Sequence, residues 1–170
     1  RLQLVEDIWD SIAELPEAVE VPQWHREELE KRLADYVGVG HTLACASGTD
    51  ALLMALMALE IGPGDAVFTS PFSFFATAEV ISLLGATPVF VDIEADSFNI
   101  DPILLEASVK DVMENSRVHP VFRSMHSDEH LVPKAVIAVD LFGLPADYPA
   151  INAISRQYGL KVIEDAAQSF

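Results

Sequence analysis

The 170-residue sequence contains a single cysteine, few basic residues and no long apolar segment. One cysteine, Cys45, cannot form an intramolecular disulfide, so the fold does not depend on an oxidising compartment and we expect a cytoplasmic protein. Ten Lys and Arg residues stand against 27 Asp and Glu residues, which gives a net charge of −17. Because the basic residues are also scattered, a nucleic-acid partner is not expected.

The apolar segments are too short for a membrane span. The longest nearly continuous one, residues 51–59, is about half of the roughly 18 to 20 residues that a bilayer requires. The amino end shows no signal peptide, and because it lacks an initiator Met and the chain stops at Phe170, we expect both ends to be cut. With 51% hydrophobic residues, the chain has the composition of a protein with an ordinary buried core.

Two kinds of sequence pattern follow one another along the chain. Residues 1–36 are charged, with apolar residues three or four positions apart, which predicts a leader of two amphipathic helices at about 3–15 and 24–36. From residue 37 to residue 170, short β-branched runs alternate with helical stretches bounded by Gly or Pro. This alternation predicts an α/β domain in which helices cover both faces of a parallel sheet.

The pattern also predicts the individual elements of this domain. The expected strands are residues 42–46, 66–69, 88–93, 135–141 and 160–164, and the expected helices are residues 49–60, 76–84, 102–114 and 147–158. Gly62, Gly85 and Gly159 follow three of these helices, where a left-handed residue commonly ends a helix. Residues 115–134 have no clean period and are expected to form an inserted surface loop.

The candidate binding residues follow the strands, because ligands of open α/β sheets lie beyond the carboxyl ends of the strands. After the first expected strand comes a small-residue turn and an apolar helix, so the N–H groups of Gly48 and Thr49 could bind a phosphate. Alternatively, Ser47 and Asp50 cap the helix and nothing binds there. The glycine patterns GxGxxG and GxxxxGK[ST] are absent from the sequence, which disfavours a Rossmann dinucleotide site and a P-loop.

Two further segments offer a ring and a carboxylate. In SPFSFF, Phe74 could stack on a flat ligand, or the aromatics could simply plug the junction of helix and sheet. Asp165 ends a buried strand and needs a cation, a helix end or a protonated ligand nitrogen, although a capping role is equally compatible. The five His residues show no metal-ligand spacing, and Cys45 is expected to be a small core residue.

Six segments within residues 28–170 carry a resemblance to a known family. They are LEKRLADYVGV, ACASGTDALLMAL, IGPGDAVFTSPFSFFATAEVISLLGATPVFVDI, FNIDPILLE, VDLFGLPADYPAINAISRQYG and VIEDAAQSF. In this order and spacing they resemble the DegT family of pyridoxal-phosphate-dependent sugar aminotransferases. The resemblance implies a three-layer, mostly parallel sheet of the aminotransferase type I large domain, here incomplete. It also implies a homodimer that transfers an amino group from glutamate or glutamine to a nucleotide-linked keto-sugar.

The resemblance assigns roles to particular residues. It places Gly48 and Thr49 in the phosphate cradle of pyridoxal phosphate, Phe74 against the ring, Asp165 at the pyridine nitrogen and Gln168 near the phenolic oxygen. A carboxylate at the pyridine nitrogen keeps it protonated, so that the ring can accept electrons during transamination.

The chain also departs from the family. The family's Schiff-base lysine follows the EDAAQ segment, and none of the four lysines here, Lys31, Lys110, Lys134 and Lys161, has that context. We therefore expect no catalytic nucleophile and no transamination from this chain as given. Residues 1–36 also resemble short antitoxin-like proteins of bacterial addiction modules. An alternative hypothesis is therefore an interaction protein that binds a toxin through residues 1–36.

Overall fold

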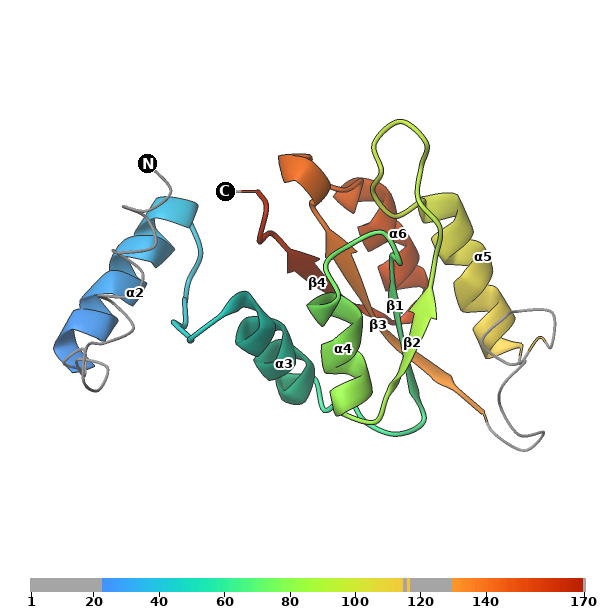
Figure 1. Ribbon diagram of the computed structural model, residues 1–170, viewed down its shortest axis with the longest axis horizontal. Coiled ribbons are helices and arrows are strands. Elements are labelled where there is room, and N and C mark those ends of the chain that lie inside the picture. The colour runs from blue at the N-terminus through green and yellow to red at the C-terminus, as the bar shows by residue number, and fades with distance from the viewer. Residues whose placement is uncertain (1–22, 115, 117–129, 170) are drawn as a thin grey trace, which may run out of the picture. The chain divides into compact units, whose positions relative to one another are not determined.

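The computed structural model describes residues 23–114, 116 and 130–169 (Figure 1). The chain divides into two compact units, residues 1–44 and 45–170. In the first unit, helix α2 spans Gln23–Val37, which confirms the helix expected at 24–36. The helix expected at 3–15 lies outside the described residues. None of the helices in the described ranges has the length and apolarity needed to cross a membrane.

The second unit is built on a parallel sheet whose four described strands have the order β2-β1-β3-β4. The strands are β1 (Asp65–Thr69), β2 (Thr87–Phe90), β3 (Val132–Val139) and β4 (Lys161–Asp165). Val67 pairs with Pro88 on one side and with Ala135 on the other, and Val136 pairs with Val162. Four of the five expected strands are therefore confirmed, with shifted ends.

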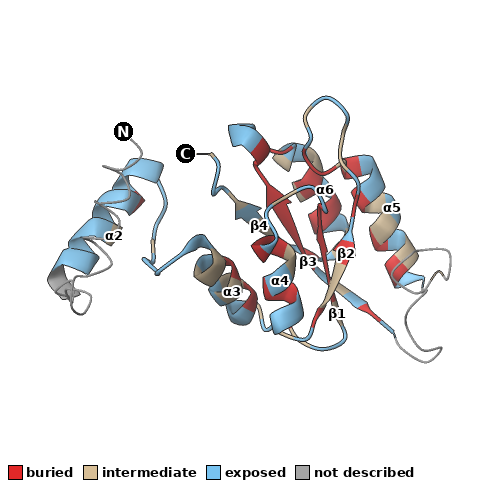
Figure 2. Ribbon diagram, in the orientation of Figure 1, coloured by how far each residue is buried: buried red, intermediate tan, exposed pale blue. Residues whose placement is uncertain are grey.

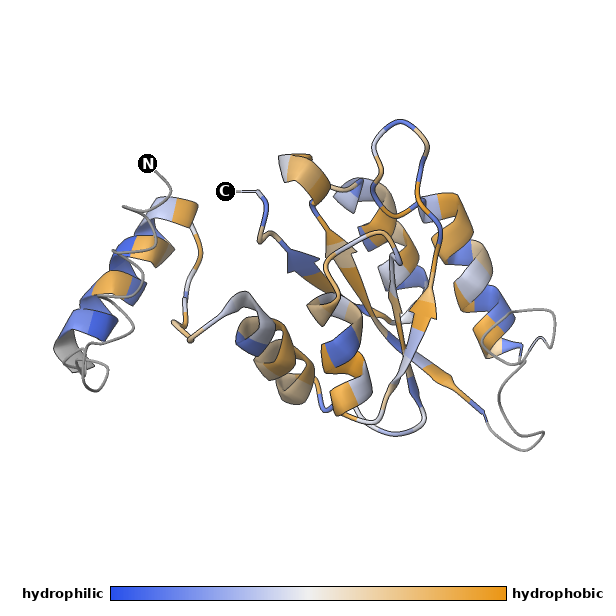
Figure 3. Ribbon diagram, in the orientation of Figure 1, coloured by the Kyte–Doolittle hydropathy of each residue, from blue (hydrophilic) through white to orange (hydrophobic). Residues whose placement is uncertain are grey.

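Helices cover both faces of the sheet, which confirms the three-layer α/β class. Side chains alternate along the strands, so Val67 and Ile137 pack on one face while Phe68 and Val136 pack on the other. The helices of the first face are α3 (Gly48–Ala58) and α4 (Ala76–Leu83), and those of the second face are α5 (Pro102–Met113) and α6 (Tyr148–Tyr158). The central strands are buried and hydrophobic (Figures 2 and 3).

The segment from His41 to Ser47 differs from the prediction. Residues 42–46 form no strand, because a strand needs a hydrogen-bonded neighbour and none of the described strands pairs with this segment. The expectation that Cys45 is a core residue is also wrong. Its thiol is exposed and donates a hydrogen bond of 3.3 Å to the carbonyl of Ser47.

The turns and loops that connect the elements agree in part with those predicted from the sequence. Gly85 and Gly159 adopt the expected left-handed conformation, with φ of 76° and 72°. The expectation for Gly62 is wrong, because Glu60 takes the left-handed conformation after α3, with φ of 56°. The expected loop at 115–134 is shorter at its carboxyl end, since β3 begins at Val132, and residues 117–129 lie outside the described residues.

Candidate functional site

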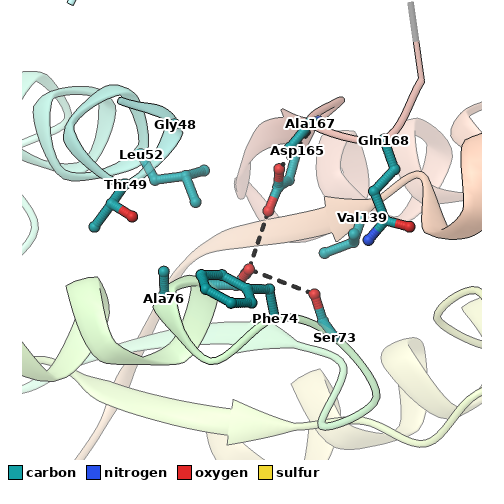
Figure 4. A pocket seen from close by; sticks show the side chains of 11 residues that line it. Gly48, Thr49, Leu52, Ser73, Phe74, Ala76, Val139, Asp165, Ala167 and Gln168 are labelled. Carbon is teal, nitrogen blue, oxygen red and sulfur yellow. Dashed lines mark hydrogen bonds between the residues drawn. The ribbon is translucent and has the colours of Figure 1, made fainter. Parts of the chain in front are cut away.

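A cavity of about 350 Å³ lies at the carboxyl ends of the parallel strands (Figure 4). It is formed by the start of α3, the segment that joins β1 to α4, the last residue of β3 and the segment that follows β4. The lining residues are Gly48, Thr49, Leu52, Ser73, Phe74, Ala76, Thr77, Val139, Asp165, Ala167 and Gln168. All five residues that the sequence analysis singled out as binding residues therefore line one cavity.

The first residues of α3, Gly48 and Thr49, line this cavity. Ser47 is the N-cap, and its hydroxyl accepts a hydrogen bond of 3.1 Å from the Asp50 N–H and donates one of 2.9 Å to the Asp50 carboxylate. The predicted cap itself is thus confirmed, and it uses only the N–H of Asp50. The N–H groups of Gly48 and Thr49 have no hydrogen-bond acceptor among the described residues, and they lie at the positive end of the helix dipole.

Asp165 is the last residue of β4, and a residue of α4 holds its side chain by a hydrogen bond. Its Oδ2 atom accepts a hydrogen bond of 3.0 Å from the Thr77 hydroxyl, which lies 3.5 Å from the Ser73 hydroxyl (Figure 4). Its Oδ1 atom has only a long contact of 3.4 Å with the N–H of Ala167. The Oδ2 atom is therefore fixed by α4, whereas the Oδ1 atom can still accept a hydrogen bond from another donor. Thr77 is not among the residues predicted from the sequence, because its partner is 88 residues away and no local pattern signals the contact.

Phe74 offers an exposed ring at the cavity. Its side chain is 73% exposed, as is that of Phe75, and Phe72 is 47% exposed. The alternative prediction, that these aromatic residues fill the junction of helix and sheet, is therefore wrong, since none of the three is buried. Phe72 instead joins an aromatic cluster, with its ring centroid 5.8 Å from that of Phe98 and 6.5 Å from that of Phe142.

Gln168 is fixed by the turn that follows β3. Its Oε1 atom accepts a hydrogen bond of 2.8 Å from the backbone N–H of Phe142. Because an N–H must face an acceptor, this bond fixes the amide orientation and leaves the Nε2 donors of Gln168 available. Gly143 allows the close approach, since it has φ of 84° and a Cβ there would lie 3.1 Å from the Gln168 carbonyl oxygen. In Figure 4 the amide nitrogen is turned toward Val139, which also lines the cavity.

Next to this cavity, two carboxylates occupy unlike environments. Asp140 is buried, which acts to raise its pKa, but hydrogen bonds from Ser169, Tyr148 and the N–H of Ala146 hold the pKa of that carboxyl below its ordinary value. Glu164 lies on the exposed edge strand, where desolvation and the negative charge of Asp140 raise its pKa. Burial and the hydrogen bond to Asp140 likewise raise the pKa of Tyr148. Asp140 is therefore a carboxylate at neutral pH, held by three donors.

The cavity lining contains no lysine within the described parts of the chain. All four lysines are exposed elsewhere, and two of them face carboxylates: Lys110 lies 2.8 Å from Glu106, and Lys134 lies 4.0 Å from Asp65. Over residues 23–114, 116 and 130–169, no group of three or more His, Cys, Asp or Glu residues could hold a metal ion.

A helix start, an exposed ring and a carboxylate thus lie around one cavity at the strand ends of an α/β domain, which is where ligands of open α/β sheets bind. The chain belongs to the DegT/DnrJ/EryC1/StrS aminotransferase family, whose model matches residues 18–170. This match includes all of helix α2, and it accounts for that part of the leader without reference to antitoxin-like proteins.

The chain matches part of the sequence of longer curated proteins. It is 50% identical over 143 residues to the UDP-2-acetamido-2-deoxy-3-oxo-D-glucuronate aminotransferase of Pseudomonas aeruginosa, covering 84% of this chain and 34% of that protein. It is 45% identical over 141 residues to the UDP-N-acetyl-3-dehydro-alpha-D-glucosamine 3-aminotransferase of Acidithiobacillus ferrooxidans, covering 83% of this chain and 33% of that protein. The chain thus spans about a third of the length of the curated relatives it matches.

Solved structures show the same fold. A DegT DnrJ EryC1 StrS aminotransferase from Brucella abortus superposes with a TM-score of 0.76 at 47% identity, covering 98% of this chain and 40% of that one. NtdA from Bacillus subtilis, solved with bound cofactor PMP, superposes with a TM-score of 0.71 at 31% identity, covering 98% of this chain and 34% of that one. The fold of the second unit is therefore that of an aminotransferase domain, as the resemblance implied.

Proposed function

We propose that this chain is the amino-terminal part of a pyridoxal-phosphate-dependent aminotransferase that acts on nucleotide-linked keto-sugars, with glutamate or glutamine as amino donor. One observation carries the proposal: three segments far apart in the sequence bring Gly48 and Thr49, Phe74, and Asp165 with Gln168 to a single cavity. The names of the relatives support the substrate class, since two of them are aminotransferases of UDP-linked oxo-sugars.

The residues around the cavity fit the cofactor group by group. The free N–H groups of Gly48 and Thr49 would bind its phosphate, and the exposed face of Phe74 would stack on its ring. The Oδ1 atom of Asp165 would hold a proton at the pyridine nitrogen, and Nε2 of Gln168 would donate to the phenolic oxygen. When bound, pyridoxal phosphate supplies the electron sink of transamination.

Within this proposal the chain binds the cofactor but does not supply the nucleophilic lysine. All four of its lysines are exposed and none lines the cavity, which supports this division. The chain as given would then hold pyridoxal phosphate without completing a transamination.

The proposal also places the protein in the cytoplasm as a homodimer. The exposed thiol of Cys45 suits a reducing compartment, and the exposed apolar side chains of α3 and α4, such as Met57 and Leu83, suit a subunit contact. The alternative, a toxin partner for residues 1–36, rests on the antitoxin-like resemblance alone. Genes for sugar-nucleotide synthesis beside this one would favour the aminotransferase, whereas a gene for a small basic toxin would favour the alternative.

Cofactor binding tests the proposal directly, and two neighbouring phenylalanines provide a matched pair. Phe74 and Phe75 are both 73% exposed, but only Phe74 lines the cavity. In equilibrium dialysis against pyridoxal phosphate, we expect Phe74→Ala to weaken binding roughly three- to tenfold, as loss of one ring stack predicts. Phe75→Ala should leave the Kd within about twofold of the unsubstituted chain. Equal effects of the two substitutions, or no saturable binding at all, would contradict the proposed site.

A further inference from the structure

Asp140 is a buried carboxylate that belongs to none of the roles proposed above. It directly follows β3 and is 1% exposed. Its Oδ1 atom accepts hydrogen bonds from the Tyr148 hydroxyl at 2.7 Å and from the N–H of Ala146 at 3.0 Å, and its Oδ2 atom accepts one from the Ser169 hydroxyl at 2.6 Å. A buried ionised group is costly unless it is fully hydrogen-bonded, so these three donors stabilise a charge that the core by itself would disfavour.

The two carboxylate oxygens of Asp140 connect different parts of the molecule. Oδ1 faces the start of α6, through Tyr148 and Ala146. Oδ2 faces the segment after β4, where Ser169 directly follows Gln168. In addition, the N–H of Asp140 donates a hydrogen bond of 3.1 Å to the carbonyl of Asp165. Asp140 therefore contacts the segment that carries both Asp165 and Gln168 at two points.

The contact to Ser169 adds to the one that holds Gln168. The Phe142 N–H bonds to the Gln168 side chain, and Phe142 lies two residues after Asp140 in the same turn. Segment 165–169 and turn 140–143 are thus joined by three hydrogen bonds, of which the one from Ser169 to Asp140 is charge-assisted and shortest. Loss of that bond would release the end of segment 165–169 from the turn.

We propose that Asp140, acting through Ser169, is a positioning residue that keeps Gln168 and Asp165 directed at the cavity. Asp140 does not itself line the cavity, so its effect on a ligand is indirect. The proposal rests on the proposed function for the identity of the ligand, pyridoxal phosphate. It does not depend on that function for the link between Ser169 and the orientation of Gln168, which can be measured without any ligand.

Substitution of Asp140 itself would not separate positioning from folding, because it would disturb all three bonds. Two neighbouring substitutions separate them. Ser169→Ala removes the side-chain bond between segment 165–169 and Asp140 and leaves the backbone bond from Asp140 to Asp165 in place. Tyr148→Phe removes the hydroxyl that bonds to Asp140 from the side of α6. Ser169→Thr keeps a hydroxyl at the same position and serves as the rescue variant.

The first readout is amide hydrogen exchange of Phe142 in the full chain without cofactor, since this N–H is protected by Gln168. The second is the Kd for pyridoxal phosphate. We expect Ser169→Ala to accelerate exchange at Phe142 and to weaken cofactor binding, each by roughly five- to tenfold. This is less than the roughly ten- to hundredfold effect of losing a hydrogen bond to a charged group, because both readouts respond to that bond indirectly. Tyr148→Phe should lower the melting temperature but leave both readouts within about twofold, and Ser169→Thr should restore both.

The outcomes distinguish the two proposals. If the unsubstituted chain binds no pyridoxal phosphate, the proposed function fails, while the exchange of the Phe142 amide still tests the positioning role. If Ser169→Ala leaves the exchange rate unchanged, or if Tyr148→Phe accelerates it equally, the positioning role of Asp140 is overturned.

Discussion

Asp140 and Glu164 are neighbouring carboxylates whose surroundings shift their pKa values in opposite directions. Asp140 receives three hydrogen bonds, which outweigh the effect of burial and lower its pKa. Glu164 receives no comparable set of donors, and desolvation together with the charge of Asp140 raises its pKa above the ordinary 4.5. A raised carboxyl pKa means that the folded state binds the proton more tightly than the unfolded state does. The free energy of unfolding therefore falls as the pH rises through that range.

This pair predicts a pH-dependent effect of Glu164→Gln. Above the raised pKa, the substitution removes a negative charge beside Asp140, so we expect a small increase in melting temperature at pH 7. The increase should disappear as the pH falls below 4.5, where protonated Glu164 already resembles glutamine. Thermal melts at a series of pH values would measure this. The control is Asp96→Asn, which removes one charge from an exposed loop, and an equal increase there would attribute the effect to net charge alone.

The four lysines allow a second prediction at the scale of single residues. Because Lys31, Lys110, Lys134 and Lys161 are exposed and none lines the cavity, none should react specifically with bound pyridoxal phosphate. Incubation with the cofactor, reduction with borohydride and peptide mass spectrometry should reveal no stoichiometric modification at any single lysine. Stoichiometric labelling of Lys134 or Lys161 would contradict the division of roles proposed for this chain.

At the scale of elements, α5 shows how local sequence sets a helix start. Asp101 is its N-cap and accepts hydrogen bonds from the N–H groups of Ile103 and Leu104 at 2.7 Å and 3.2 Å, and Pro102 occupies the first turn. The helix then buries Leu105 and Val109 against the sheet. The cap and the apolar spacing are both local, which is why the sequence predicted this helix within a residue of its observed end.

We expect Asp101→Ala to lower the free energy of unfolding by about 1 kcal/mol, the usual effect of losing an N-cap side chain. Urea denaturation followed by circular dichroism would measure the change. Asp111→Ala is the matched control, because Asp111 lies in the last turns of the same helix, where a negative charge opposes the helix dipole. It should not destabilise the protein, and a loss equal to that of Asp101→Ala would show that the cap is not the cause.

In contrast to α5, the structure of residues 42–46 was not predicted correctly from the local sequence. Its apolar and β-branched composition predicted a strand, but it pairs with none of the described strands. Strand formation depends on a neighbour that can be distant in the sequence, so composition alone does not decide it. The start of α3 directly after this segment was nevertheless predicted, since the Ser47 cap is a local signal.

At the scale of the whole molecule, the described sheet has two strands with a neighbour on one side only, β2 and β4. Exposed apolar side chains accompany them, including Phe90 on β2 and Met57 and Leu83 on the helices. Unpaired strand edges and apolar surface favour association with another chain.

We therefore expect this chain to associate in solution in a concentration-dependent way, as dimers or larger species. Sedimentation velocity over a hundredfold range of protein concentration would detect the shift. A monodisperse monomer at the highest concentration would contradict the prediction. Association that vanishes in moderate salt would attribute it to charge rather than to the apolar surface, since salt screens charges but strengthens apolar contacts.

The sequence by itself determined the alternation of strands and helices, the ends of several helices and the residue types suited to a cofactor, because these depend on local spacing and on caps. The tertiary structure decided which of those residues meet. It brought Thr77 to Asp165, the Phe142 N–H to Gln168 and Ser169 to Asp140. Each of these contacts joins residues at least 26 positions apart, and only parallel pairing of the strands places their carboxyl ends at one edge of the sheet.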